Sequence, residues 1–244
     1  MPERRPNSDS DADLFAWAES WLLSPDEPCP TWMAGTVFDE LEKTHLKGYG
    51  RLSTFAREFA VYEILHENLV QSLANLLSGE LLVLEVGAGN GLLSKFLRDA
   101  GVNAVATDNY SWKMKRRAPV RRMRYNTAVD HYNPSCVVCC WMPYGADWTP
   151  AFRACPSVQR YVLIGEGSGG CCGSDETWGG HVYDEDTGEY QQVPGGFEKD
   201  GWSTYEWPAA NLCRTDYRSN GGVCRHSSIQ VFERPQEDSP NASA

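Results

Sequence analysis

The chain has 244 residues, of which 41% are hydrophobic, and it contains 9 Trp, 11 Tyr and 8 Phe. This composition predicts a folded protein and excludes an intrinsically disordered one. The formal net charge of −11 disfavours non-specific binding to nucleic acid. No apolar run is long enough for a membrane helix, and residues 1–13 lack the apolar core of a signal peptide. We therefore expect an intracellular protein without a membrane partner, in the cytoplasm or, alternatively, in the nucleus.

The sequence pattern divides the chain into four segments. Residues 1–12 and 235–244 are polar and are predicted to be disordered tails. Residues 13–78 carry apolar side chains at helical spacing and are predicted to form a helical extension. Residues 79–234 alternate short apolar runs with helical patterns, which predicts one domain that follows this extension.

Two helices are predicted in the extension. The first covers residues 13–23 and is short and amphipathic. The second runs from Phe55 to Leu76, with Ser53 as its expected N-cap and Gly79 as its stop. Its aromatic residues recur on one face, and we interpret them as core packing.

The strands of the main domain are indicated by apolar runs. Five runs predict strands, at residues 81–86, 102–107, 136–141, 161–164 and 228–233. A helix from Leu92 to Ala100 follows the first strand. Strands that alternate with helices predict an α/β fold with a doubly wound, mostly parallel sheet. The segment 167–200 is rich in glycine and polar residues, so we expect a long irregular loop that is functional or mobile.

The strongest functional signal is the sequence EVGAGNG, which begins at Glu85. Gly87, Gly89 and Gly91 follow a strand and open a helix, so a ligand can approach the backbone and the unpaired N–H groups of the helix closely. A dinucleotide fingerprint would require a third glycine at position 92, which is Leu92. The spacing therefore indicates a different nucleoside ligand.

Acidic residues at the next strand ends support a nucleoside cofactor. Asp108 directly follows the second strand, where a carboxylate can accept two hydrogen bonds from a ribose diol. Nicotinamide-binding folds share this position, so Asp108 alone does not choose between cofactors. We place a third strand end at Asp130, on the side of the adenine.

Glu85 and the three glycines resemble motif I of the class I, Rossmann-like methyltransferases, which use S-adenosylmethionine (SAM) as cofactor. The resemblance implies that Glu85 lies near the aminoacyl part of SAM. It also implies that the segment before motif I closes over the cofactor, so Tyr49 or Arg51 reaches the cofactor carboxylate.

The segment after the fourth strand, CWMPYG from Cys140, stands in the place of motif IV of these enzymes. Methyltransferases that act on base amines have Asp or Asn there, followed by Pro-Pro and an aromatic residue. In this chain Trp141 and Met142 replace the first two of these residues, so methylation of a base amine is not implied. Trp141 and Tyr144 are candidates for an aromatic wall that faces the substrate or the sulfonium cation. Core packing is the equal alternative for Trp141.

A glycine-rich loop follows the predicted strand 161–164, with the sequence GEGSGGCCGSD. Together with Trp-x-Pro-Tyr upstream it resembles a little-characterised group of methyltransferase-like proteins with Trp-Pro-Pro-Tyr and Gly-Glu-Gly-x-Gly-Gly-Cys segments, over residues 45–234. Glu166 and Tyr144 are our candidate catalytic residues, with Glu166 as a substrate-binding group or general base. A carboxylate that orders the loop is the alternative for Glu166.

The nine cysteines are predicted to be mostly reduced thiols, because their number is odd and two pairs are adjacent in sequence. Cys136 and Cys139 would point to opposite faces of one strand, which suits a tetrahedral zinc site poorly. We therefore predict no metal site.

Seven cations lie in one short segment: Lys113, Lys115, Arg116, Arg117, Arg121, Arg122 and Arg124. They predict either a solvated face or a contact with an anionic ligand. The function that we expect is SAM-dependent methyl transfer to a small-molecule or protein acceptor. The alternatives are an RNA or DNA methyltransferase that uses segment 113–124, and a non-catalytic relative that binds the cofactor.

Overall fold

The computed structural model describes residues 20, 23, 26–29, 59, 61–167, 170–184, 186–208 and 227–235. The predicted tails, Tyr49, Arg51, Ser53 and most of the predicted helix at 13–23 lie outside these residues. No helix in the described part of the chain has the length and apolar character needed to cross a membrane.

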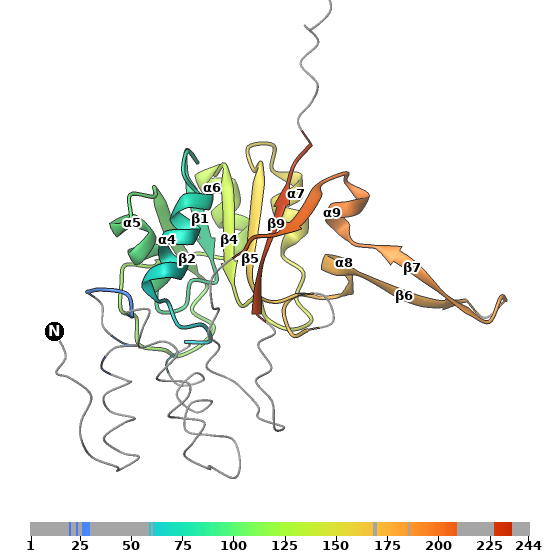
Figure 1. Cartoon of the computed structure of the whole chain (residues 1–244), viewed down its shortest axis with the longest axis horizontal. Helices are drawn as coiled ribbons and strands as arrows, with labels where there is room; N and C mark the ends of the chain where they lie inside the picture. The colour runs from blue at the N-terminus through green and yellow to red at the C-terminus, as the bar shows by residue number, and fades with distance from the viewer. Residues whose placement is uncertain are drawn as a thin grey trace, which may run out of the picture.

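A seven-stranded sheet forms the centre of the described fold, in the order β3-β2-β1-β4-β5-β9-β8 (Figure 1). The strands are β1 (Val83–Val86), β2 (Ala104–Asp108), β3 (Arg121–Arg122), β4 (Cys136–Cys140), β5 (Arg160–Glu166), β8 (Ser203–Glu206) and β9 (Ser227–Glu233). The first five are parallel, and β9 runs antiparallel between β5 and β8. This is a Rossmann-like α/β fold, and each of the five predicted strands is confirmed with bounds within two residues.

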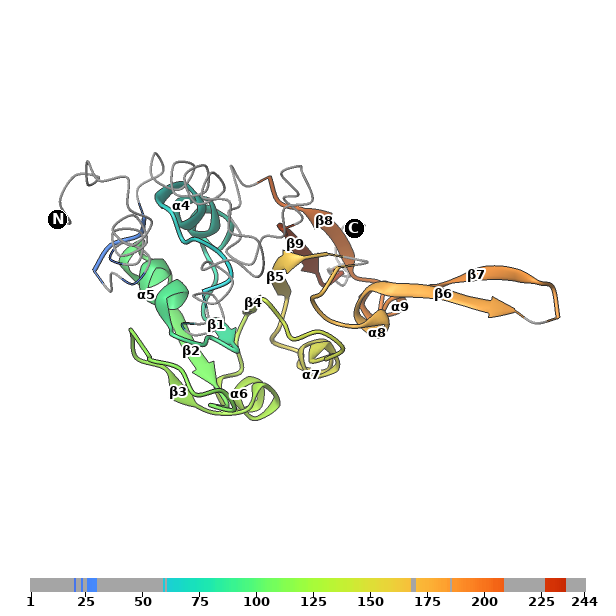
Figure 2. The same cartoon turned by 90° about the horizontal axis from the view of Figure 1, so that it is seen from below.

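Helices cover both faces of the sheet (Figure 2). On one face lie α4 (Glu67–Leu76) and α5 (Leu92–Asp99), whose leucines pack with Val83, Val138 and Ile164. On the other face lie α6 (Tyr125–Tyr132) and α7 (Thr149–Ala154), which pack with Leu84 and Val137. Because both faces are covered, consecutive residues of β1 and β4 are buried, as the unbroken apolar runs predict.

The predicted helix 55–76 is confirmed only in its second half, since residues 61–66 are not helical. The helix α4 begins after His66, whose Nδ1 accepts the N–H of Leu69 at 3.3 Å. The backbone of Cys29 pairs with this segment: its N–H donates to Leu65 O and its carbonyl accepts from Glu67 N–H, both at 3.0 Å. These bonds hold the chain extended before α4, so the helix cannot extend toward Phe55 through it.

The prediction of an irregular loop at 167–200 is wrong for residues 175–199. The chain forms α8 (Asp175–Trp178), a hairpin of β6 (Gly179–Asp184) and β7 (Glu189–Pro194), and α9 (Gly196–Lys199). The hairpin projects from the body of the molecule (Figure 1). Asp184 closes its turn because Oδ1 accepts the N–H groups of Asp186 and Thr187, and Gly188 supplies a φ of 70°.

The strand end predicted at Asp130 is also wrong. Asp130 lies in α6 and is exposed, and the third strand is the short β3, which lies within the basic segment. Two consecutive arginines form β3 and pair with Thr107 and Asp108 at the edge of the sheet. An edge strand of two exposed cations has no apolar periodicity, so the sequence pattern could not reveal it.

Candidate functional site

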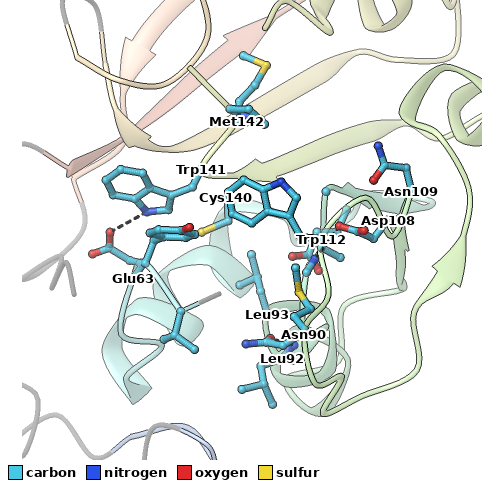
Figure 3. A pocket seen from close by; sticks show the side chains of 18 of the residues that line it. Glu63, Asn90, Leu92, Leu93, Asp108, Asn109, Trp112, Cys140, Trp141 and Met142 are labelled. Atoms are coloured by element: carbon cyan, nitrogen blue, oxygen red, sulfur yellow. Dashed lines mark hydrogen bonds between the residues drawn. The ribbon is translucent and has the colours of Figure 1, made fainter. Parts of the chain in front are cut away.

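A cavity of about 340 Å³ lies at the carboxyl ends of β1, β2 and β4. The chain order reverses between β1 and β4, and open α/β sheets bind their ligands in the crevice at such a point. The walls come from the ends of these strands, from the segment before α4 and from the segment that follows β2 (Figure 3).

The glycine loop after β1 forms the floor of this cavity, and its three glycines have different surroundings. Gly87 and Gly89 line the cavity with φ values of 66° and 54°, which favour glycine. Gly91 is the N-cap of α5 and is not among the lining residues. With a φ of 82°, a Cβ at Gly91 would lie 2.6 Å from Val120 Cγ2. The first two glycines therefore allow ligand approach, whereas Gly91 allows close packing.

Asn90 fastens the glycine loop to its neighbours. Its Oδ1 accepts the N–H of Leu92 at 2.9 Å and caps the first turn of α5. Its carbonyl accepts the N–H groups of Arg117 and Ala118 at 2.9 and 3.1 Å. The loop that lines the cavity and the basic segment are thus joined through one backbone carbonyl.

The carboxyl group of Glu85 is buried behind the glycine loop, and Glu85 is among the lining residues. Its Oε2 accepts both the N–H and the hydroxyl of Ser94 in α5. Burial is the largest influence and raises the pKa of Glu85 from 4.5 to about 7, against the lowering effect of the two Ser94 hydrogen bonds. Near neutral pH a charged ligand can therefore change the protonation of the Glu85 carboxyl group.

Asp108 ends β2 with its carboxylate at the cavity wall. Oδ2 accepts the N–H of Gly89 at 3.1 Å and Oδ1 accepts the N–H of Tyr110 at 2.6 Å. These bonds hold the carboxylate beside the glycine loop, as the motif predicts. Each oxygen has a further lone pair that can accept from a ligand hydroxyl.

The end of β4 places Trp141 against the segment before α4. Trp141 has a φ of 63°, unusual for a bulky side chain, and its N–H donates to Ile164 O at 2.8 Å. Its indole Nε1–H donates to Glu63 Oε2 at 3.3 Å, and its ring lies 5.7 Å from that of Tyr62 (Figure 3). All three residues line the cavity, so Trp141 is a wall residue and not only core.

Further aromatic side chains line the cavity and its mouth. Trp148 stacks on Tyr125 with ring centroids 5.1 Å apart, and a Cβ at Gly87 would lie 3.0 Å from the Trp148 ring. Tyr144 and Trp112 also line the cavity while 81% and 54% exposed, so they lie at its mouth. The cavity is consequently apolar in most of its wall, with carboxyl groups at a few positions.

Glu166 lies at the end of β5 and is not among the lining residues. Its Oε2 accepts the N–H of Cys171 at 2.6 Å, and a Cβ at Gly170 would lie 2.3 Å from Glu166 Cβ. The carboxylate therefore orders the turn that brings Cys171 to the cavity wall. This geometry fits the alternative that the sequence leaves open, a loop-ordering carboxylate.

One other sequence-predicted residue is not brought to the site, and a second lies outside the described residues. Asp130 is on α6 and does not line the cavity, and Tyr49 lies outside the described residues. Several wall residues are not predicted from the sequence: Tyr62, Glu63, Asn90, Trp112, Tyr125 and Trp148. Of these, Trp112 could have been proposed from the sequence, because it is an aromatic residue directly before the basic segment 113–124.

Burial favours the neutral thiol form of two cysteines in β4. Cys136 and Cys139 lie inside β4, and burial raises the pKa of both thiols well above the ordinary value. Among the residues that the structure describes, no group of three His, Cys, Asp or Glu side chains could hold a metal ion.

No family model matches the sequence, and no curated protein is similar to it in sequence. Solved structures share parts of the fold at low identity. A 1,6-didemethyltoxoflavin-N1-methyltransferase from Burkholderia thailandensis is 9% identical, with 97% of this chain and 95% of that chain covered and a TM-score of 0.40. A magnesium protoporphyrin IX methyltransferase from Synechocystis PCC 6803, with bound SAM, is 15% identical over 68% of this chain and 78% of that chain, with a TM-score of 0.37. The 23S rRNA methyltransferase ErmE is 16% identical, with 70% of this chain and 69% of that chain covered and a TM-score of 0.34.

Proposed function

We propose that this chain binds SAM in the cavity and transfers the SAM methyl group to an acceptor. One observation carries the proposal: the glycine loop and the carboxylate of Asp108 meet at one cavity, joined by the Gly89 N–H bond at 3.1 Å. The glycine loop carries the resemblance to motif I, and Asp108 has the strand-end position expected of a carboxylate that binds a ribose. The strand order, with β1 between β2 and β4 and an antiparallel β9 beside β5, is the sheet that this class of methyltransferase has.

The residues present fit a nucleoside cofactor that carries a positive charge. Asp108 can accept hydrogen bonds from the ribose hydroxyls with its remaining lone pairs. Met114 and Met123, which line the cavity from the segment after Asp108, offer apolar contact for the base. Trp141 and Tyr62 present aromatic rings, which attract a sulfonium cation.

Bound SAM supplies a methyl group that is activated by its sulfonium. The chain then needs to align the acceptor and to exclude water, because direct displacement at a methyl carbon depends on orientation. In such a transfer the acceptor lone pair would form the bond to the methyl carbon while the carbon–sulfur bond breaks and leaves its electron pair on sulfur, and a proton lost by the acceptor would pass to solvent. Trp141 and Tyr144 are placed to wall this space, and the Cys171 turn held by Glu166 closes another side.

The size of the cavity restricts how the acceptor arrives. Small-molecule pockets usually have volumes of about 300–1,000 Å³, and 340 Å³ is near the lower end of that range. One cofactor therefore takes most of the space, and an acceptor enters through the mouth between Trp112 and Tyr144. A small molecule or a protruding group of a larger partner meets this condition.

Calorimetric titration of the full chain with S-adenosylhomocysteine tests the proposal. We expect one binding site in the wild type; absence of binding would overturn the proposal. Asp108→Asn should weaken binding by about tenfold or more, since one charge-assisted acceptor is lost. Asp130→Asn is the matched control, because Asp130 is exposed on α6 and outside the cavity. Equal effects of the two substitutions would contradict a ribose site at Asp108.

A further inference from the structure

The basic segment 113–124 carries its charge without neutralisation. No acidic residue lies between Asp108 and Asp130 in the sequence. Within the described part of the chain none of the seven cations makes an ion pair, and six of them are exposed. In a chain with a net charge of −11, a concentration of positive charge of this kind attracts an anionic partner.

The glycine loop and the residues at the end of β2 hold the basic segment in place. Arg117 and Ala118 donate their N–H groups to Asn90 O, and Met123 donates its N–H to Asp108 O at 2.9 Å. The hydroxyl of Tyr110 donates to Val120 O at 2.5 Å. These bonds order the segment before any partner binds, which lowers the entropy cost of binding.

Two aromatic residues lie among the cations. The guanidinium of Arg116 lies 3.2 Å from the ring centroid of Tyr110, and that of Arg122 lies 5.9 Å from it. Trp112 is 54% exposed at the mouth, and with Met114 it lines the cavity. Lys113 and Lys115 alternate with these two residues, are exposed and are not among the lining residues.

We propose that this surface binds a single-stranded nucleic acid, with the cations of 113–124 on its phosphates and Trp112 as a stacking platform at the mouth. Exposed cations that track a backbone beside an aromatic side chain are the combination that binds single strands. The cations run along the chain from the residue after Trp112 to the edge strand β3 and to Arg124 beyond it. The binding surface stands by itself; that the nucleic acid is also the methyl acceptor rests on the proposed function.

Fluorescence anisotropy with labelled single-stranded RNA and DNA of about 12 nucleotides tests the surface. With the full chain, log Kd against log salt should have a slope of magnitude about 5 if all seven cations contact phosphates of a single strand. Lys113→Gln/Lys115→Gln should weaken binding about tenfold and reduce this slope by about 1.4. Lys199→Gln, an exposed lysine on α9, is the matched control and should change neither quantity.

Three outcomes would overturn the proposal: a slope near zero, equal losses in the double variant and in Lys199→Gln, or equal competition by an oligoglutamate of similar charge. Trp112→Leu separates stacking from charge, and we expect about tenfold weaker binding with an unchanged slope. Titration with S-adenosylhomocysteine is run in parallel. Cofactor binding without RNA or DNA binding rejects this surface and leaves the proposed function standing, and the reverse result rejects only the proposed function.

Discussion

The indole N–H of Trp141 donates to Glu63 Oε2 at 3.3 Å, which joins the end of β4 to the segment before α4. Glu63 is only 3% exposed, so the bond forms in a nearly water-free place. Trp141 adopts a φ of 63° there, a conformation that costs a bulky residue about 1–3 kcal/mol. Two segments far apart in the sequence thus hold one wall of the cavity.

Trp141→Phe should lower the free energy of unfolding by about 1–3 kcal/mol, because a smaller aromatic ring replaces the indole and the hydrogen bond to a buried carboxyl is lost. Trp148→Phe is the control, since Trp148 stacks on Tyr125 without a side-chain hydrogen bond in the described residues. Guanidinium unfolding of both variants measures the difference. Equal losses would show that the Glu63 bond contributes nothing.

The stability should depend on pH through Glu85. Its pKa of about 7 in the folded chain exceeds the ordinary 4.5, so between these values the folded state binds more protons than the unfolded state. The contribution is complete below about pH 4.5 and is lost as the pH rises through 7, by about 3 kcal/mol in total. Urea unfolding at pH 5 and pH 8 should show this loss in the wild type and a smaller one in Glu85→Gln. The same loss in both chains would assign it to other groups.

Gly89→Asp should abolish binding of S-adenosylhomocysteine, because Gly89 lines the cavity and a second carboxylate would face Asp108. Gly201→Asp is the matched control: Gly201 has a φ of 75° and open space around its Cβ position. Both variants carry a backbone cost of about 1 kcal/mol, visible in thermal unfolding. Calorimetry separates them, and retained binding in Gly89→Asp would contradict a cofactor on this loop.

Gly91→Ala should destabilise the chain by about 2–3 kcal/mol, from its positive φ and from the 2.6 Å approach to Val120 Cγ2. In a Val120→Ala background the second contribution is removed, so the added cost should fall to about 1 kcal/mol. A double-mutant cycle by chemical denaturation measures this coupling. Strictly additive effects would refute the packing role of Gly91.

The sequence was informative where chemistry and local pattern coincide. The apolar runs of β1 and β4 predict buried strands, and the positions of Gly89 and Asp108 after their strands predict that they meet. Long-range pairing was not predictable. Cys29 pairs with the chain at His66 and stops the helix that the spacing of apolar residues extends to Phe55.

Two further residues show where a local sequence pattern is compatible with more than one structure. Asp130 follows two apolar residues, Ala128 and Val129, which are buried in α6. A strand would bury such a short apolar run equally well, so the run does not distinguish a strand from a helix. Glu166 has the residue type and strand-end position of a catalytic carboxylate, yet its oxygen is directed to the Cys171 amide. The direction of a side chain at a strand end depends on the loop that follows, and a glycine-rich loop contains few local signals.

The position of β9 has a consequence for synthesis on the ribosome. β9 lies between β5 and β8, contributing Ile229 and Val231 to one core and Phe232 to the other, and it follows both neighbours in the chain. The half of the sheet from β1 to β4, with the glycine loop, is translated by residue 140, whereas β5 keeps an open edge until β9 emerges. A nascent chain thus exposes an unpaired strand edge beside the half of the sheet that carries the glycine loop, which makes this interval the one most open to mispairing with other chains.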